Sequence, residues 1–549
     1  MPALDAVFRS PRGTDAAAPR FARIRNRAYT ARMEPLPKYG RQFFEADVFD
    51  GAPRARRHDV PLGEVVEPAR RTPLWARTQV LVAGGGPAGT AAAIAAARAG
   101  AQVMLVERYN HLGGLSTGGL VIWIDRMTDW HGVPVIRGLA EELIAALPRD
   151  EVAGPPRAEW GARDAASAAW WAARTAAFHG VVTWSPTVSP ESLKTVSQRL
   201  VVDAGVELVH HAWIVDVLPD PDDASRIAGV VLESKQGRLA IAADVFVDAT
   251  GDADLVAAAS RRRGADPATD AAPDWVDDID AGDIHHAINT SWLYGGVDMR
   301  AWLAFRATRP ADFAAFMARG RAELGLFEKP FVSWRDDVAL FMGPRRAGLS
   351  ALSLEDLTRV EVESRDLMAS HLAFYRANAP GFGRAYALQM APQVGARHSR
   401  RIAGVARMSR EDWTAGTVHP DEVGVSPSPA LSVPNVSVRL GALVPRRFSN
   451  LLAPGKHLAS DPASHAFMRE IPQCWLTGQA AGAAAAQAAA ARSDLRALPI
   501  APLRRALRGQ GVVLHGGDGD AAKAEAVRAG AGDDVRAAGA VVAGRGDAR

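Results

Sequence analysis

The chain of 549 residues contains one cysteine, Cys474, and no apolar run of membrane-spanning length apart from segments rich in glycine and alanine. A single cysteine excludes an intramolecular disulfide and is typical of a reducing compartment. Without a spanning segment or the apolar core of a secretory signal, we expect a cytoplasmic protein with no membrane span. The formal net charge is +3, from 64 basic and 61 acidic side chains, so the charge balance does not indicate a nucleic-acid partner.

Two further absences limit the chemistry. The adjacent histidines His285 and His286 have no cysteine or acidic residue at metal-ligand spacing, so we expect no metal site. A second G-x-G-x-x-G is missing, which argues against an in-chain NAD(P)H domain of the disulfide-reductase kind. The remaining composition, 48% hydrophobic and 23% charged, is that of a globular protein long enough for two or more domains.

A glycine turn lies between two short apolar runs near residue 80, where the chain reads VLVAGGGPAGTAAAIAAARAGAQVMLVE over 80–107. The apolar runs 80–83 and 102–106 are too short for helices and predict buried strands. The alanine-rich segment 90–99 between them favours a helix that lies close to a sheet. Strand, turn, helix and strand in this order predict a βαβ unit with parallel strands.

Gly84, Gly86 and Gly89 fit the pattern G-x-G-x-x-G in the turn of this unit. The first glycine permits the tight turn, the second lets the backbone approach a pyrophosphate, and the third lets the helix pack on the strand. The start of the helix supplies amide donors and a positive dipole end. Glu107 closes the second strand, where a carboxylate accepts ribose hydroxyls and would repel the 2′-phosphate of NADP. The unit therefore predicts a site for a dinucleotide other than NADP.

Strand and glycine-turn sequence returns further along the chain, so the nucleotide-binding domain is expected to be discontinuous. Residues 190–218 predict a helix and strands, 227–232 and 238–242 a hairpin, 245–248 a strand, and 477–491 a long helix of small residues. Whether residues 1–32 belong to the native protein is left open. The predicted organisation is an N-terminal extension, partly disordered, over 1–74; nucleotide-binding parts over 75–120, 190–260 and 391–514; a substrate-side insertion over 121–189; a substrate or cap domain over 261–390; and a flexible tail over 515–549.

Four blocks of the chain, together with RHSRRIAG at 397–404, resemble a known family. They read VLVAGGGPAGTAAAIAAARAGAQVMLVERYNHLGGLSTGG, PESLKTVSQRLVVDAGVEL, VFVDATGDADLV and NLLAPGKHLASDPASHAFMREIPQCWLTGQAAG. In this order they are similar to the FAD-dependent oxidoreductases related to the flavoprotein subunits of fumarate reductase and succinate dehydrogenase. The resemblance implies an α/β fold, in which a Rossmann-like, glutathione-reductase-like FAD-binding domain carries an inserted α+β substrate or cap domain.

The resemblance implies noncovalent FAD as the cofactor. The loop LGGLSTGG would run beside the pyrophosphate and the isoalloxazine, with Ser116 and Thr117 as hydroxyl donors. A helix beginning near Gly478 and Gln479 would direct amide donors at flavin N1 and the C2 carbonyl. His111 lies near the position of a covalent flavin ligand in fumarate reductases, but its spacing to the following glycines differs, so no covalent bond is expected. The residues expected at the cofactor are Gly84, Gly86, Pro87, Ala88, Gly89, Glu107, Arg108, Gly113, Gly114, Ser116, Thr117, Ile214, Gly251, Gly455, Gly478, Gln479 and Ala480.

The residues that meet the substrate are expected in the same blocks. Arg397 or Arg400, and Arg469, are candidates to bind a substrate anion. His457 or His465 is the candidate base. A structural or ion-paired role is the alternative for each of them. The predicted catalytic residues are His457, Arg469 and Arg397.

The sequence departs from the family at Lys456-His457, where arginine followed by a small residue is commoner. This departure puts in doubt any role copied from the family at the substrate face. Eleven of the 14 tryptophans lie between Trp123 and Trp334, where they would either line a ligand pocket or fill a core.

The function predicted from these features is that of an FAD-dependent oxidoreductase of the dehydrogenase or oxidase type. It would dehydrogenate or reduce a small organic substrate by hydride transfer at flavin N5. A flavin-containing isomerase or lyase without net redox, and a non-catalytic nucleotide-binding protein, are the alternatives. The expected partners are a small-molecule substrate and an electron acceptor, which is dioxygen, a quinone or a partner protein. Assembly into a homo-oligomer is left open.

Overall fold

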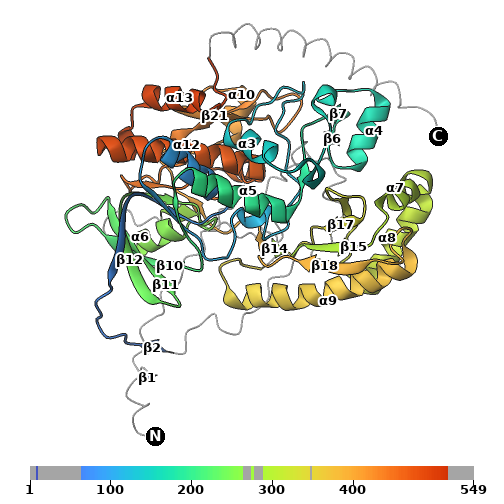
Figure 1. The fold of residues 1–549 in the computed structure, drawn as a ribbon, viewed down its shortest axis with the longest axis horizontal. Coiled ribbons are helices and arrows are strands. Elements are labelled where there is room, and N and C mark those ends of the chain that lie inside the picture. Colours follow the sequence, from blue (N-terminus) through green and yellow to red (C-terminus); the bar gives the residue numbers. More distant parts are fainter. Residues whose placement is uncertain (1–7, 10–62, 264–273, 277–287, 347–348, 517–549) are drawn as a thin grey trace.

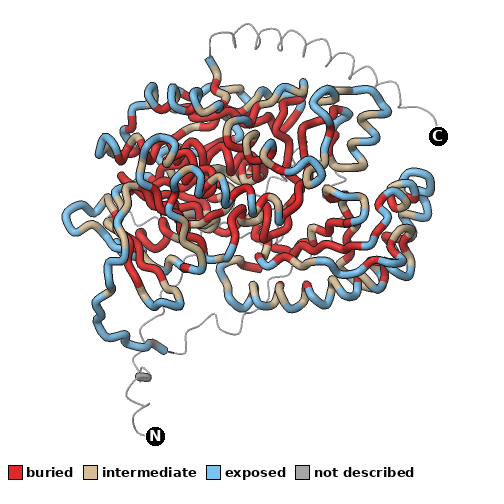
Figure 2. Tube along the Cα trace, in the orientation of Figure 1, coloured by how far each residue is buried: buried red, intermediate tan, exposed pale blue. Residues whose placement is uncertain are grey.

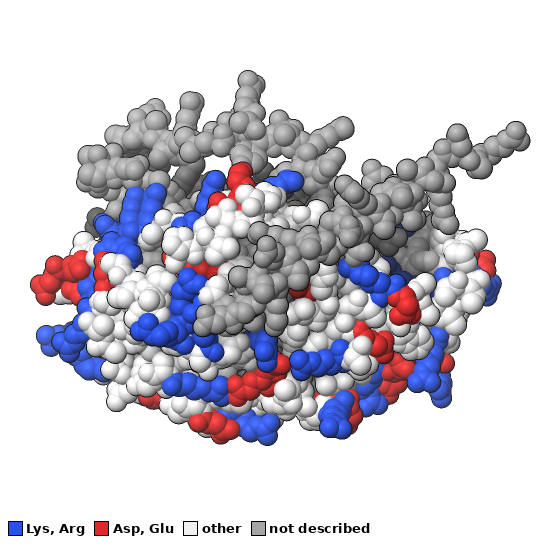
Figure 3. Space-filling model, turned by 90° about the horizontal axis from the view of Figure 1, so that it is seen from above, with Lys and Arg blue, Asp and Glu red and all other residues white. Residues whose placement is uncertain are grey.

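The computed structural model describes residues 8–9, 63–263, 274–276, 288–346 and 349–516 (Figure 1). The predicted tail from residue 517 onward, most of the predicted N-terminal extension, and the pair His285-His286 lie outside these residues. No helix in the described part of the chain is long and apolar enough to cross a membrane. On the face shown in Figure 3, basic and acidic side chains are interspersed over the surface.

A seven-stranded sheet forms the centre of the fold, with the order β10-β11-β12-β3-β4-β9 and β23 paired to β12. β12, β3, β4, β9 and β23 are parallel, whereas β10 and β11 continue the sheet as an antiparallel meander. This arrangement confirms the predicted α/β class with a Rossmann-like domain. The strands are β3 (Leu74–Ala83), β4 (Val103–Val106), β9 (Glu207–Val209), β10 (Trp213–Pro219), β11 (Ile227–Ser234), β12 (Gly237–Asp248) and β23 (Leu451–Leu452).

Two of the predicted strands are longer in the structure. The segment predicted as 80–83 is only the buried end of β3, which begins at Leu74 because residues 240–243 of β12 pair with its exposed half. The segments predicted as 238–242 and 245–248 form the single strand β12. Its first half pairs with β11 and its last residues pair with β23, so one strand serves both the meander and the parallel sheet.

Helices α2 (Pro87–Arg98) and α12 (Ile471–Ala491) pack against each other and against the sheet. A Cβ atom added at Gly478 or Gly482 would lie 2.1 Å from the carbonyl oxygen of Ala88 or Ala92, so only glycine fits at both places. These two helices and the sheet strands make up the most deeply buried part of the molecule (Figure 2). Small side chains let the helices approach closely, which explains the alanine-rich composition of both.

The prediction that the alanine-rich helix begins near Gly478 is wrong. The helix begins at Ile471, with Glu470 at its N-cap and a proline in its first turn. The glycines that resembled a helix start lie inside the helix, where the backbone of α2 replaces the side chains that they lack.

Within the predicted cap domain, the described residues 288–346 and 349–390 form a four-stranded sheet in the order β16-β17-β15-β18 and three helices, of which α9 runs along the outer side of the sheet (Figure 1). We refer to this part of the chain as the cap. It has an aromatic core of its own, in which Trp292, Trp302 and Tyr375 are fully buried. For these two tryptophans the core alternative is therefore correct. The elements are β15 (Trp292–Gly295), α7 (Met299–Thr308), α8 (Pro310–Leu324), β16 (Phe331–Val332), β17 (Val338–Phe341), α9 (Leu354–Asn378) and β18 (Tyr386–Met390).

Short elements connect the cap and the insertion to the central domain. β14 pairs with β19, and β13 pairs with β20, so the chain entering the cap lies beside the chain leaving it. The remaining helices are α3 (Leu139–Ala145), α4 (Ala165–Ala173), α5 (Pro190–Asp203), α6 (Asp254–Arg263), α10 (Arg410–Ala415), α11 (Pro462–Met468) and α13 (Ile500–Gly509). The short strands are β1 (Phe8–Arg9), β2 (Glu64–Val65), β5 (Val152–Ala153), β6 (Ala177–Phe178), β7 (Val181–Val182), β8 (Thr187–Val188), β13 (Trp275–Val276), β14 (Ile288–Asn289), β19 (Gly395–Ala396), β20 (Arg401–Ile402), β21 (Glu422–Ser426) and β22 (Val436–Arg439).

Candidate functional site

A cavity of about 510 Å³ lies at the carboxyl ends of β3, β4 and β12. Its walls come from the turn after β3, the end of β4, the start of β10, the turn after β12, residues 392–397, residues 454–457 and the start of α12. The cap closes it from another side with residues of β14, of the segment after β17 and of α9. Ligands of open parallel sheets bind at this edge, so the cavity is the candidate site.

The turn between β3 and α2 has the backbone shape that the glycine pattern predicts. Gly84 has φ +95°, and a Cβ atom there would lie 2.6 Å from the carbonyl oxygen of Ala249. A Cβ atom at Gly89 would lie 1.8 Å from the carbonyl oxygen of Gly84, so this glycine lets α2 pack on its own turn and does not line the cavity. A Cβ atom at Gly86 would have no protein atom within 4 Å, because Gly86 faces the cavity.

Glu107, at the end of β4, fastens this turn to the neighbouring strand. Its Oε2 accepts a hydrogen bond from the amide of Gly85 at 2.6 Å, and its Oε1 accepts one from the amide of Tyr109 at 2.8 Å. The side chain is buried on the cavity wall, and each oxygen retains a second lone pair for a ribose hydroxyl. The predicted acid is thus beside the turn and has a structural role there, whereas its role toward a ribose stays a prediction.

Arg108 and Trp213 lie at the same end of the cavity as Glu107. The guanidinium carbon of Arg108 is 5.0 Å from the ring centre of Tyr109 and 5.2 Å from that of Trp213. Trp213 is 56% exposed although it lines the cavity, and Ile214 follows it on the wall. An exposed indole beside a guanidinium offers a flat surface to an aromatic base.

The loop 112–119 reaches the cavity through Gly114 and Leu115, whereas Gly113, Ser116 and Thr117 do not line it. The hydroxyl of Ser116 donates to the carbonyl of Gly113 at 2.7 Å, and that of Thr117 donates to the carbonyl of Leu112 at 2.6 Å. The prediction that these hydroxyls serve the pyrophosphate is not met in this structure. In this loop the short polar side chains instead form hydrogen bonds with carbonyl groups of the neighbouring backbone.

His111 is held by its neighbours in the protein. Its Nδ1 is 2.7 Å from the side-chain oxygen of Asn110, and its Nε2 is 3.1 Å from the side-chain nitrogen of Gln393. Burial and the nearby Lys194 lower the pKa of His111 to about 4. Its ring lies outside the cavity wall, whereas Gln393 lines the cavity.

The start of α12 reaches the cavity through Glu470, Ile471 and Cys474. Gly478, Gln479 and Ala480 lie one to two turns further along the helix and do not line the cavity. The side-chain oxygen of Gln479 accepts from the amide of Leu139 at 3.0 Å, and its nitrogen donates to the carbonyl of Gln510. The positive end of the α12 dipole does point at the cavity. The helix begins seven residues earlier than predicted, at Ile471 and not near Gly478.

The turn after β12 carries a group of acids, of which Asp248 is fully buried and Asp252 and Asp254 are partly exposed. Asp248 accepts from the amides of Leu255 and Val256 at 2.9 and 3.1 Å, which shapes the start of α6. Arg400 donates to the carboxylate of Asp254 at 2.9 Å and is therefore ion-paired and not part of the cavity wall. Burial, with the nearby Asp252, raises the pKa of Asp254 to about 6.

All three predicted catalytic residues line the cavity, and Arg345 of the cap joins them there. Arg345 is 8% exposed, and Arg469 lies 3.3 Å from the carboxylate of Glu470. Sequence reasoning missed Arg345, since nothing in its local sequence separates it from the many other arginines.

The two candidate bases differ in their positions. His457 lines the cavity and is fully buried, and its Nε2 is 2.9 Å from the carbonyl oxygen of Asp248. Burial lowers its pKa, so the imidazole is neutral at pH 7. His465 packs against His398, with 4.7 Å between ring centres, and does not line the cavity.

Tryptophans contribute little to the cavity. Of the eleven between Trp123 and Trp334, only Trp123 and Trp213 line it among the residues that the structure describes. Trp160 and Trp184 stack on each other in the insertion, with 4.7 Å between ring centres.

Comparison with known proteins gives one family and several distant relatives. The profile of the family described as FAD dependent oxidoreductase matches residues 79–507. An NADH oxidase of Thermoanaerobacter brockii is 42% identical over 89 residues, which are 14% of this chain and only 14% of that protein. A geranylgeranyl bacteriochlorophyll reductase-like protein from Thermoplasma acidophilum is 12% identical, with 78% of this chain and 90% of that chain covered and a TM-score of 0.38. The flavin-dependent brominase Bmp2 is 16% identical, with 79% and 84% covered and a TM-score of 0.39.

The cavity residues fit a flavin adenine dinucleotide. The open space in front of Gly86 is what a Cβ atom would fill, and it lies at the first turn of α2, where backbone amides and the helix dipole favour phosphate. Glu107 lies on one side of this turn, and the start of α12 lines the same cavity. The cavity therefore offers donors for the phosphates, an acceptor for the ribose and the positive end of a helix for a ring system.

Proposed function

We propose that this chain, which belongs to the FAD-dependent oxidoreductase family, dehydrogenates or reduces a small organic anion. Its cofactor is FAD, which when bound exchanges hydride at flavin N5. The observation that supports this proposal is one cavity that contains both the dinucleotide turn and the side chains of three arginines and a neutral histidine. Cations and a base beside a hydride carrier are what oxidation of a C–H bond requires.

The arginines are the groups proposed to bind the substrate. Arg345 comes from the cap, Arg397 follows β19, and Arg469 ends α11, so three separate segments bring guanidinium groups to one cavity. Guanidinium binds carboxylate through two parallel hydrogen bonds, which fixes the orientation of the substrate as well as its position. A carboxylate-bearing substrate is therefore the class that these residues favour.

His457 is the proposed base. Its Nε2 faces a carbonyl oxygen, which only accepts hydrogen bonds, so the ring proton is on Nε2 and the lone pair is on Nδ1. No described residue gives Nδ1 a hydrogen-bond partner. Nδ1 is buried in the cavity wall, and a neutral imidazole is the state in which a histidine can take a proton as the C–H bond of a substrate breaks.

The cap and the insertion both contribute apolar side chains to the cavity wall. Met342 and Leu357 line it from the segment after β17 and from α9, and Val121 and Trp123 line it from the insertion. Apolar walls keep water from the reacting groups and strengthen the attraction between arginine and carboxylate.

Anaerobic mixing of the yellow holoprotein with a panel of carboxylates, and with the amide of each as a matched control, tests the proposal. We expect a carboxylate to bleach the flavin absorbance and its amide to do so at least tenfold more slowly. Arg397→Gln should slow bleaching by the active carboxylate at least tenfold, whereas Arg300→Gln, an exposed arginine on α7, should not change it.

The alternatives give different results. Flavin that converts a substrate but never bleaches indicates an isomerase or lyase, and flavin that neither bleaches nor turns over indicates a nucleotide-binding protein. Admitting dioxygen or a quinone after bleaching identifies the acceptor from the rate at which the absorbance returns. A panel in which neutral compounds bleach the flavin as fast as carboxylates would contradict the proposed substrate class.

A further inference from the structure

Lys456 lies in the cavity wall and is held by two acceptors from different segments. Its Nζ is 3.0 Å from Oδ1 of Asp252 and 3.0 Å from the carbonyl oxygen of Ala396. An ammonium group has three N–H donors, and the described residues provide acceptors for two of them. The side chain is 14% exposed and lines the cavity, and its third donor has no hydrogen-bond partner among the described residues.

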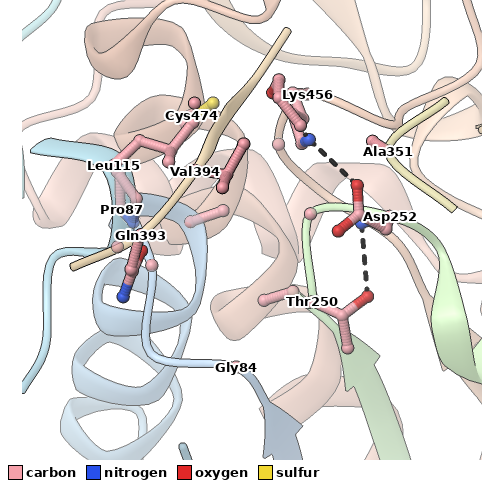
Figure 4. Close-up of a pocket in the computed structure, with 18 of the residues that line it drawn as sticks. Gly84, Pro87, Leu115, Thr250, Asp252, Ala351, Gln393, Val394, Lys456 and Cys474 are labelled. Atoms are coloured by element: carbon pink, nitrogen blue, oxygen red, sulfur yellow. Dashed lines mark hydrogen bonds and ion pairs between the residues drawn. The ribbon is translucent and has the colours of Figure 1, made fainter. Parts of the chain in front are cut away.

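The backbone before Lys456 lies close to the first turn of α2, whereas its ammonium group faces the turn after β12. The preceding residue, Gly455, is so close to the first turn of α2 that its Cβ would lie 3.0 Å from that of Ala88. The turn after β12 approaches from the other side, since a Cβ atom at Gly251 would lie 3.1 Å from Cε of Lys456. Figure 4 shows the pair of Lys456 and Asp252 on one side of the cavity, with Pro87 on the other.

The charges around the turn show why a cation is needed there. Three carboxylates line this part of the cavity, those of Glu107, Asp252 and Asp254. Burial by itself would raise the pKa of Asp252, but Lys456 and a hydrogen bond from Ser399 hold it down at about 2, so the pair is ionised at neutral pH. A diphosphate with two negative charges would meet repulsion from these acids. Lys456 and Arg108, which also lines the cavity and helps to lower the pKa of Asp252, are the cations that offset this repulsion.

We propose that Lys456 is a ligand of the FAD diphosphate, and that Asp252 and the carbonyl of Ala396 hold its ammonium group in position. The residue supplies the point charge that the backbone amides of the glycine turn cannot supply. The inference rests on the FAD of the proposed function but not on its substrate, so failure of the bleaching experiment leaves it unaffected.

The experiment measures dissociation constants for FAD and for riboflavin, which lacks phosphate, with the full-length chain freed of flavin. Lys456→Met should raise the constant for FAD at least tenfold in 50 mM NaCl and change that for riboflavin less than twofold. The difference for FAD should shrink in 1 M NaCl, where the screening length is about 3 Å. Lys456→Arg should retain FAD within about threefold, and Lys235→Met, in the exposed β11–β12 turn, should match the wild type.

Equal FAD affinity of Lys456→Met and the wild type would overturn the proposal. So would equal losses of FAD and riboflavin, which would indicate a structural role. If Lys456→Met does not fold, Lys456→Gln decides the question, because its side-chain amide keeps a donor for Asp252 but carries no charge. That variant should also raise the dissociation constant for FAD at least tenfold, and an FAD affinity equal to that of the wild type would overturn the proposal.

Discussion

Replacing Gly478 by alanine tests whether this part of α12 acts through packing on α2 or at the cofactor. A Cβ atom at Gly478 would lie 2.1 Å from the carbonyl oxygen of Ala88 and 2.7 Å from its Cα. Both are backbone atoms, so no side-chain rotation relieves the overlap. The two helices would have to separate by about 1 Å or more to restore ordinary contact distances.

The expected change in the free energy of unfolding is the sum of two opposing effects. Alanine is favoured over glycine in a helix interior by about 1 kcal/mol. Overpacking a close contact costs about 1 to 3 kcal/mol. An overlap with backbone at 2.1 Å belongs at the upper end of that range. We therefore expect a net loss of about 1 to 2 kcal/mol, with weaker FAD binding because Ala88 also lines the cavity.

Urea unfolding of the FAD-free chain, followed by circular dichroism, measures this change. Gly86→Ala is the matched control, because a Cβ atom there has no neighbour within 4 Å and the φ of −67° suits any residue. The control should keep its stability within about 0.5 kcal/mol of the wild type and still lose FAD affinity. A Gly478→Ala chain as stable as the wild type would refute the packing argument. If Gly478→Ala lost FAD affinity while its free energy of unfolding stayed unchanged, the result would indicate that Gly478 acts at the cofactor.

Two further outcomes are expected. The pKa of Asp254 is raised to about 6 from 3.8, so its contribution to stability is present below about pH 4 and is lost as the pH rises through about 6. Asp254→Asn should therefore gain stability relative to the wild type at pH 7.5 but not at pH 4, as thermal unfolding at the two pH values would show; an equal difference at both would contradict the raised pKa. His457→Ala should slow anaerobic flavin reduction by substrate about 100-fold or more while FAD affinity changes less, because it removes the proposed base. An unchanged reduction rate in stopped-flow mixing would remove His457 from the mechanism.

Local patterns allowed the backbone shape of the glycine turn to be predicted. Gly84, Gly86 and Gly89 are close in sequence, and each responds to a demand made within one βαβ unit: a positive φ, an open approach to a ligand, or contact with the adjacent turn. Glu107 could be identified for the same reason, since its strand follows directly. The FAD cofactor and the α/β class follow from these features together with the family resemblance.

The predictions that failed depended on contacts between distant segments. Gly478 resembles a helix start when its sequence is read alone, and only the backbone of Ala88 explains a glycine inside the helix. Ser116 and Thr117 have the right chemistry for phosphate, but their own loop takes their hydroxyl groups. In each case the residue type was compatible with two uses, and a neighbour decided between them.

The sequence by itself determined where the glycine turn and its neighbouring acid lie, because they are made of backbone and of residues within about thirty positions of one another. Only the tertiary structure decided which charges share the cavity. Lys456 and Asp252 are 204 positions apart, and Arg345 comes from a separate part of the fold. Charge interactions depend on distance in space and on burial, and neither quantity can be obtained from the order of residues before the segments have packed.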